Sequence, residues 1–174
     1  DALFRYPQSR SVELRPPICA KSHRDPGEVI VGTRPDEITE LLAKAFLSTE
    51  DDIVVSQSAS LQYRISAQLM GAGVIATPLK NWKCDLDAMA SAVSKRTKLV
   101  FVAKPNNPTG TANGRDELAS FIDRVPAHVL VVLDQAYFEY IDDPDYADAI
   151  AEHFQNGRRV VVLRTFSKIY GLAG

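Results

Sequence analysis

Apolar and polar positions alternate along the chain in blocks of two kinds. Short runs dominated by apolar and β-branched residues are typical of strands buried on both faces of a sheet. These predicted strands cover residues 28–32, 52–55, 74–77, 98–103, 128–133 and 159–163. The segments between them carry apolar residues three and four positions apart, which indicates helices packed on one side. These predicted helices cover residues 35–46, 63–70, 86–93, 115–124 and 146–154.

The repeated order of strand, loop and helix predicts an α/β fold. We expect three layers, with a mostly parallel sheet, right-handed connections and helices on both faces. The pattern is weaker in residues 1–28, where prolines stand at positions 7, 16, 17 and 26. We expect Pro16 and Pro17 to prevent a helix there, which leaves 1–28 as an irregular N-terminal segment before a main domain at 29–174.

The amino-acid composition excludes some classes of partner but does not indicate a function. The 174 residues include 45% hydrophobic and 24% charged positions, and the formal net charge is −2. This balance gives no reason to expect nucleic acid or a membrane surface as a partner. Cys19 and Cys84 lie far apart without metal-ligand spacing, and no apolar run reaches 18 residues. The cytoplasm is therefore the expected compartment.

Candidate chemistry lies where three of the predicted strands end. The strand at 98–103 leads to Asn107, the strand at 128–133 leads to Asp134 and Tyr137, and the last strand leads to Ser167 and Lys168. The carboxyl ends of parallel strands meet at one edge of a sheet, where ligands of such folds bind. Each residue also has a structural explanation as a turn, a cap, a core aromatic or a surface lysine.

Together these side chains meet the needs of pyridoxal phosphate. This cofactor requires a lysine for a Schiff base and an anion beside its pyridine nitrogen. It also requires donors to its ring hydroxyl oxygen and a cradle for its phosphate. The candidates for these four roles are, in order, Lys168; Asp134; the pair Asn107 and Tyr137; and the hydroxyls of Thr165 and Ser167.

Three motifs carry a resemblance to a known family. They are Pro105-Asn106-Asn107-Pro108-Thr109-Gly110, Asp134-Gln135-Ala136-Tyr137, and the stretch from Arg164 to Gly174. Weaker matches are Arg5-Tyr6-Pro7, Asp36-Glu37-Ile38 and residues 63–67. With these motifs the chain resembles the class I/II, fold-type-I aminotransferases, and among them the histidinol-phosphate aminotransferases.

The resemblance implies roles for individual residues. Lys168 would form the Schiff base and move the substrate's α-proton, Asp134 would pair with the pyridine nitrogen, and Asn107 and Tyr137 would bond the ring hydroxyl oxygen. Ser167, with Thr165 beside it, would hold the phosphate. Asp36 belongs to the cofactor-binding turn, and Tyr6 would reach the phosphate of the neighbouring subunit in a homodimer.

The implied reaction is a ping-pong exchange of an amino group between histidinol phosphate and 2-oxoglutarate. The resemblance also implies a large cofactor domain followed by a small C-terminal domain, which the sequence does not contain. We therefore expect a fragment, incomplete at its C-terminus, that neither transaminates nor folds robustly alone. An aromatic amino acid aminotransferase and a non-catalytic aminotransferase-like binding domain are the alternatives.

Five positions depart from the family pattern. Arg34 and Pro35 stand where a glycine and a small residue usually help to cradle phosphate, and Ser60 stands where an aromatic ring usually stacks on the cofactor. Lys104 replaces the usual Asn or Ser, and Gln135 replaces the commonest Glu. We expect Arg34 to have difficulty with a glycine's backbone geometry, and Tyr63 to replace the missing ring only after a rearrangement.

Overall fold

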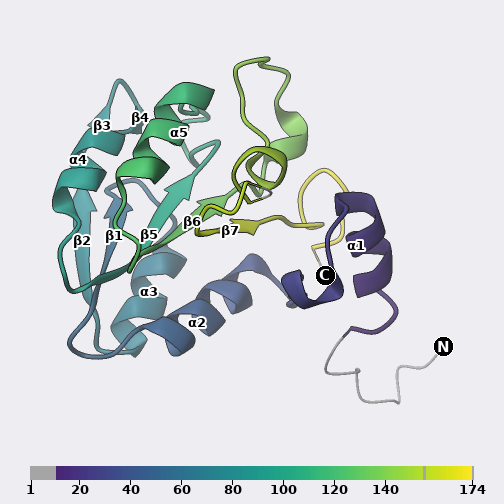
Figure 1. Cartoon of the computed structure of the whole chain (residues 1–174), viewed down its shortest axis with the longest axis horizontal. Helices are drawn as coiled ribbons and strands as arrows, with labels where there is room; N and C mark the ends of the chain where they lie inside the picture. The colour runs from purple at the N-terminus through teal and green to yellow at the C-terminus, as the bar shows by residue number, and fades with distance from the viewer. Residues whose placement is uncertain (1–10, 155, 174) are drawn as a thin grey trace. The chain divides into compact units, whose positions relative to one another are not determined.

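The computed structural model describes residues 11–154 and 156–173. The chain divides into two compact units, Asp1–Thr33 and Arg34–Gly174. The second unit is an α/β domain with a five-stranded, entirely parallel sheet in the order β2-β1-β5-β6-β7 (Figure 1). The strands are β1 (Asp52–Ser56), β2 (Gly73–Thr77), β5 (Thr97–Ala103), β6 (Leu130–Asp134) and β7 (Val160–Leu163).

Helices cover both faces of this sheet (Figure 1). One layer contains α2 (Pro35–Phe46) and α3 (Leu61–Leu69), and the other contains α4 (Leu86–Ala92) and α5 (Arg115–Arg124). Alternate strand residues feed two separate cores, so that Phe101 packs with the α2–α3 layer whereas Val100 packs with the α4–α5 layer. This double burial explains why the strands have continuous apolar sequences. The prediction of a three-layer, mostly parallel α/β fold is confirmed.

The N-terminal unit corrects two predictions. A helix, α1 (Arg15–Ser22), forms although it contains Pro16 and Pro17. Both prolines lie in its first turn, where a backbone N–H has no helical acceptor, so the missing donor costs little. The strand predicted at 28–32 is absent, because Glu28 ends the short 3-10 helix η1 (Pro26–Glu28) and the following residues pair with no strand.

Two further elements differ from the sequence prediction. The helix expected at 146–154 is reduced to η3 (Ile150–Phe154), which has π-helical geometry. A small hairpin, β3 (Leu79–Lys80) and β4 (Lys83–Cys84), was not predicted. Its two turn residues, Asn81 and Trp82, both have positive φ (51° and 64°), as the tight turn of such a hairpin requires. Trp82 is 73% exposed.

The other predicted helices agree with the structure to within a few residues, and α5 has the predicted bounds. The short 3-10 helix η2 (Phe138–Tyr140) follows β6. Among the described residues, no helix has both the length and the apolar character needed to cross a membrane.

Candidate active site

Three neighbouring strands deliver the candidate residues to one edge of the sheet. In the register of β5, β6 and β7, Ala103 lies opposite Asp134, and Asp134 lies opposite Leu163. The loops that follow therefore leave the sheet side by side, at its carboxyl edge (Figure 1). This edge is where ligands of open α/β sheets bind.

Asp134 is the last residue of β6, and both of its carboxylate oxygens accept hydrogen bonds. The Ala136 backbone N–H donates to Oδ1 at 3.0 Å, and the hydroxyl of Tyr63 donates to Oδ2. Burial raises the pKa of Asp134, and these two hydrogen bonds and the charge of Lys168 oppose that rise. A carboxylate has about four lone-pair positions, so Asp134 keeps acceptor capacity for a further donor.

Tyr137 links the candidate amine to the candidate amide. Asn107 Nδ2 lies 3.5 Å from the Tyr137 hydroxyl, at the long limit of a hydrogen bond. The Nζ of Lys168 lies 5.1 Å from the centroid of the Tyr137 ring, which is within cation–π range. Residues 30 and 31 positions apart along the chain thus meet at one place. The structure brings Asn107, Tyr137 and Lys168 together.

The two candidate phosphate-binding hydroxyls bond each other. Thr165 Oγ1 donates to Ser167 Oγ at 2.9 Å and accepts from the Ser167 backbone N–H at 3.0 Å. Because Ser167 Oγ acts as the acceptor, its own hydrogen is free to be given to an anion. The turn that precedes Lys168 is therefore preorganised, with Thr165 holding Ser167.

Asp36 lies in the first turn of α2, where its carboxylate pairs with Arg34 at 3.4 Å. Arg34 has an extended backbone (φ −151°, ψ 162°), which any residue can adopt, so the expected conflict with a glycine geometry is wrong. Pro35 has no N–H, and the amides of Glu37 and Ile38 are directed to the Arg34 carbonyl. The start of α2 thus offers the exposed guanidinium of Arg34, whereas the turn before Lys168 offers the hydroxyl of Ser167.

Neither Ser60 nor Tyr63 supplies an aromatic face for a ligand. The Oγ of Ser60 caps α3 by accepting from the Gln62 N–H at 3.3 Å. Tyr63 is only 2% exposed and stacks on Phe101, with ring centroids 4.4 Å apart and planes 12° apart. Its ring is therefore a core residue, and the idea that it replaces the stacking aromatic is not supported by this arrangement.

Gln135, which the sequence marks only as a departure from the family pattern, is a buried residue that hydrogen-bonds to several segments. Its Nε2 donates to the Tyr146 hydroxyl (2.9 Å) and to the Ala147 carbonyl (3.0 Å). Its Oε1 accepts from the Ala149 N–H (3.3 Å) and from an Arg164 Nη2 (2.9 Å). Every donor and acceptor of the amide is thus used, which ties the segment after β6 to the residue that follows β7.

Lys104 is a second buried residue whose environment the sequence did not reveal. Its side chain is fully buried, its Nζ lies 4.3 Å from the centroid of the Tyr146 ring, and Nζ has no hydrogen-bond partner among the described residues. Burial lowers the pKa of Lys104 to about 8, although the nearby Glu152 opposes this. The hydroxyl of Tyr146 donates to the Lys104 carbonyl, so both groups belong to the network around Gln135.

The donor set at the sheet edge fits pyridoxal phosphate. It offers one amine, one carboxylate with spare acceptor capacity, a phenol beside a carboxamide, and a serine hydroxyl available to an anion. Tyr6 lies outside the described residues.

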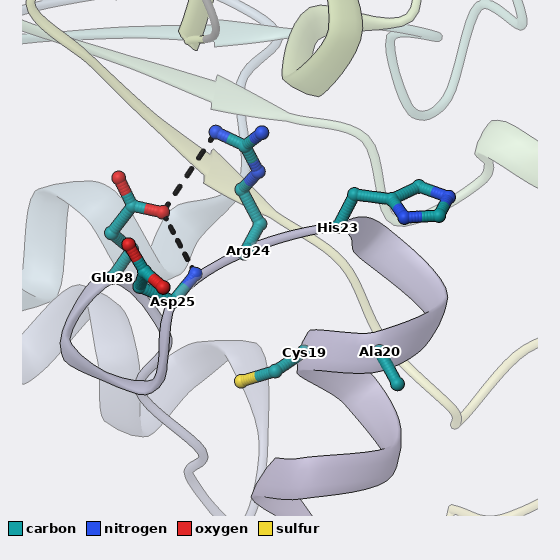
Figure 2. A pocket seen from close by; sticks show the side chains of 6 residues that line it. All are labelled: Cys19, Ala20, His23, Arg24, Asp25 and Glu28. Carbon is teal, nitrogen blue, oxygen red and sulfur yellow. Dashed lines mark hydrogen bonds and ion pairs between the residues drawn. The ribbon is translucent and has the colours of Figure 1, made fainter.

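A separate hollow of about 330 Å³ in the N-terminal unit contains none of the predicted site residues (Figure 2). Its lining includes Asp25, whose backbone N–H donates to Glu28 at 3.1 Å.

Comparison with known proteins identifies a family and several named relatives. The family model "Aminotransferase class I and II" matches residues 1–174. Histidinol-phosphate aminotransferase of Moorella thermoacetica is 42% identical over 174 residues, which are 100% of this chain and 45% of that protein. The same enzyme of Anaeromyxobacter sp. is 44% identical over 170 residues, which are 97% of this chain and 46% of that protein.

Solved structures show the same fold. A putative histidinol-phosphate aminotransferase of Erwinia carotovora superposes with a TM-score of 0.90 at 26% identity, over 99% of this chain and 51% of that one. A Sinorhizobium meliloti histidinol-phosphate aminotransferase, solved in complex with pyridoxal-5'-phosphate, also gives 0.90, at 23% identity over 99% of this chain and 47% of that one.

The chain thus spans about half the length of the curated relatives that it matches. Within that half, the match extends from one end of the chain to the other. The parallel sheet is shared, and the polar side chains gathered at its carboxyl edge are those that pyridoxal phosphate requires. Sequence, fold and edge chemistry therefore agree that this chain belongs to the class I and II aminotransferases.

Proposed function

We propose that the protein carrying this chain is a pyridoxal-phosphate-dependent aminotransferase that moves the amino group of histidinol phosphate to 2-oxoglutarate. The observation that supports it most is the meeting of Lys168, Tyr137 and Asn107 beside Asp134 at one sheet edge. The relatives that are 42–44% identical are named histidinol-phosphate aminotransferases, which favours this donor over an aromatic amino acid.

Pyridoxal phosphate, when bound, supplies an aldehyde carbon open to attack by an amine and a ring that withdraws electrons from the substrate's α-carbon. In this proposal Lys168 provides that amine and later holds the substrate's α-proton on Nζ. Asp134 holds its negative charge opposite the ring nitrogen. Asn107 Nδ2 and the Tyr137 hydroxyl donate toward the ring's hydroxyl oxygen, which orients the ring.

Phosphate binding would fall to the turn between β7 and Lys168 and to the start of α2. Ser167 donates its free hydroxyl hydrogen, and Thr165 fixes the serine in place. Arg34, which pairs with Asp36 at 3.4 Å, would add its positive charge from the start of α2. In a cytoplasmic homodimer, Tyr6 would reach the phosphate of the neighbouring subunit. The amino donor and 2-oxoglutarate would bind in turn at this one site.

The decisive experiment is covalent capture of the cofactor. The full-length gene product is incubated with pyridoxal phosphate, reduced with borohydride and digested, and the modified peptide is identified by mass spectrometry. We expect the adduct on Lys168, and its loss in Lys168→Ala. Lys95→Ala is the matched control, because Lys95 is exposed and precedes β5, at the opposite edge of the sheet.

Capture on another lysine, or none at all, would contradict the proposal and favour the non-catalytic binding domain. The donor is then tested by comparing histidinol phosphate with phenylalanine and tyrosine as substrates, with 2-oxoglutarate as acceptor. A preference for the aromatic amino acids would replace the proposed donor while leaving the reaction class intact.

A further inference from the structure

We infer that Tyr63 is a positioning residue whose hydroxyl holds the Asp134 carboxylate in place and in its ionised form, opposite the cofactor's ring nitrogen. The inference rests on the proposed function, because it concerns the same site. Tyr63 itself acts only through Asp134.

Packing fixes the position of the Tyr63 hydroxyl. The ring is held between α3, which carries it, and Phe101 of β5, on which it stacks at 4.4 Å. A stacked ring in a core has little rotational freedom, so its hydroxyl oxygen is placed as firmly as the backbone. The hydroxyl meets Asp134 Oδ2 from 71 positions away in the sequence. This bond therefore connects the helical layer below the sheet to the end of β6.

The two donors to Asp134 leave its carboxylate in one orientation. Ala136 N–H fixes Oδ1 at 3.0 Å, and the Tyr63 hydroxyl fixes Oδ2. With one donor on each oxygen, rotation about the Cβ–Cγ bond would break both hydrogen bonds. The unused lone pairs of the Asp134 carboxylate then point in a defined direction. A protonated ring nitrogen can form a short, straight hydrogen bond only with an acceptor that is oriented in this way.

Two charged groups and two hydrogen-bond donors act on the ionisation of Asp134, and they act in opposite directions. Burial and the charge of Asp36 on α2 raise the pKa of Asp134, whereas Tyr63 on α3, the Ala136 N–H and Lys168 after β7 lower it. Tyr63 makes the largest contribution in favour of the carboxylate. Burial, reinforced by the Asp134 charge, raises the pKa of Tyr63 well above its ordinary value, so the phenol remains a donor throughout the working pH range.

A purely structural role makes a different prediction. A buried tyrosine usually needs some partner for its hydroxyl, and Asp134 could serve as that partner without any consequence for the cofactor. Tyr63→Phe would then lower stability and shift the titration of Asp134, but leave the bound cofactor unchanged. If Tyr63 positions Asp134, the same substitution also changes the protonation of the cofactor's ring nitrogen, which Tyr63 does not touch. The first measurement below tests the bond between Tyr63 and Asp134, and the second separates the two roles.

The first measurement needs no cofactor. The carboxyl carbon of Asp134, labelled with ¹³C in the cofactor-free protein, is followed by NMR as the pH is varied. In Tyr63→Phe we expect the Asp134 titration to move to higher pH. The matched control is Tyr146→Phe, which removes another hydrogen-bonded phenol hydroxyl, from a network that contains Gln135 and Lys104 instead. In this control the Asp134 titration should stay where it is.

The second measurement uses the full-length protein loaded with pyridoxal phosphate that is ¹⁵N-labelled in its ring. In Tyr63→Phe we expect the ring nitrogen to lose its proton at lower pH, and the cofactor to bind about tenfold more weakly. In an Asp134→Asn background, Tyr63→Phe should have no further effect on binding, because the pathway through Asp134 has already been removed.

The outcomes distinguish this inference from the proposed function. If the unmutated protein does not take up pyridoxal phosphate, the proposed function fails, while the ¹³C titration still reports on Tyr63 and Asp134. If the cofactor binds but Tyr63→Phe leaves the titration of the ring nitrogen unchanged, the inference is overturned and the proposed function stands. An effect of Tyr63→Phe that persists in the Asp134→Asn background would also overturn it.

Discussion

Asp134 and Gln135 are neighbours in sequence, at the end of the same strand, yet their surroundings are opposite in kind. Gln135 is fully buried, and the protein satisfies all of its hydrogen-bonding capacity through Tyr146, Ala147, Ala149 and Arg164. Asp134 is partly accessible, and its donors from the described residues leave lone pairs unused. Gln135 bonds only to groups of the protein, whereas Asp134 can still accept a hydrogen bond from a ligand.

This difference teaches how to tell a structural polar residue from a functional one. Exposure distinguishes this pair but is not a general criterion, because Thr165, another candidate for the cofactor site, is buried as well. The useful quantity is the number of hydrogen-bonding positions left over after the protein's own partners are counted. By this measure Gln135 belongs to the scaffold and Asp134 to the site. Four substitutions test that division.

The largest effect is expected from Asp134→Asn. The substitution keeps the shape of the side chain but removes the charge that we propose lies opposite the cofactor's ring nitrogen. Turnover should therefore fall by about 10³-fold, while stability changes by only about 1 kcal/mol. Steady-state kinetics and urea unfolding of the same preparation provide the two numbers. A loss of activity below tenfold would mean that Asp134 has a structural role, like Gln135, and would contradict the distinction between the two residues.

Lys104→Met should produce the next largest change, in stability. The pKa of Lys104 is lowered to about 8 in the folded protein, so the unfolded chain binds more protons between about pH 8 and 10.5. Burying the ammonium therefore costs most below pH 8, and the cost disappears as the pH rises through this window. We expect Lys104→Met to stabilise the protein at pH 7, and the gain to shrink by roughly 2–3 kcal/mol by pH 10.

Urea unfolding of both proteins at several pH values checks this expectation, since titrations shared by the two chains cancel in the difference. A gain that is constant with pH would mean that Lys104 is neutral at pH 7 or has a partner in solution. Either result would remove Lys104 from the set of unsatisfied polar groups.

Gln135→Glu, which introduces the residue expected from the family resemblance, should destabilise this protein by about 2 kcal/mol. A carboxylate cannot donate to the Ala147 carbonyl, and the hydroxyl hydrogen of Tyr146 is already given to Lys104. The ion pair gained with Arg164 offsets part of the loss. The measurement is thermal unfolding, with the exposed Gln57→Glu as the matched control, for which we expect almost no change. Equal effects at both positions would show that the network around Gln135 is not what matters.

Tyr146→Phe should give the smallest of the four effects, a loss of about 1 kcal/mol. It removes one hydroxyl that bonds the Lys104 carbonyl and the Gln135 amide, but it keeps the ring beneath the Lys104 amine. Activity should stay near that of the unmutated protein. If activity fell as far as in Asp134→Asn, the network on the Gln135 side would have to be regarded as part of the site.

The sequence predicted the sheet and most of its helices because those elements depend on local periodicity. The amphipathic pattern of α5 defines its bounds, and the apolar run of β5 reflects burial on both faces. The errors have physical causes. α1 forms because prolines are harmless in a first turn, and residues 29–31 are apolar but pair with no strand.

The candidate site was predictable in part. Asn107, Asp134, Tyr137 and Lys168 could be placed at one edge because parallel strands must end there, although their roles remain predictions. The hydrogen-bond partners of Asp134 could not be predicted from the order of strands and loops. Its bond to Tyr63 spans 71 positions and depends on how a helix packs against a strand, which no local pattern records.

The exposed hairpin turn has a practical consequence. Trp82 is the only tryptophan in the sequence, and its indole already lies largely in water. Its fluorescence emission will therefore change little when this chain unfolds, so tryptophan fluorescence would report the transition poorly. Its carbonyl, however, accepts from Thr111 Oγ1 at 2.6 Å, on the loop that also carries Asn107. Trp82 is thus a built-in fluorophore beside this loop, suited to detecting ligand binding by quenching or energy transfer.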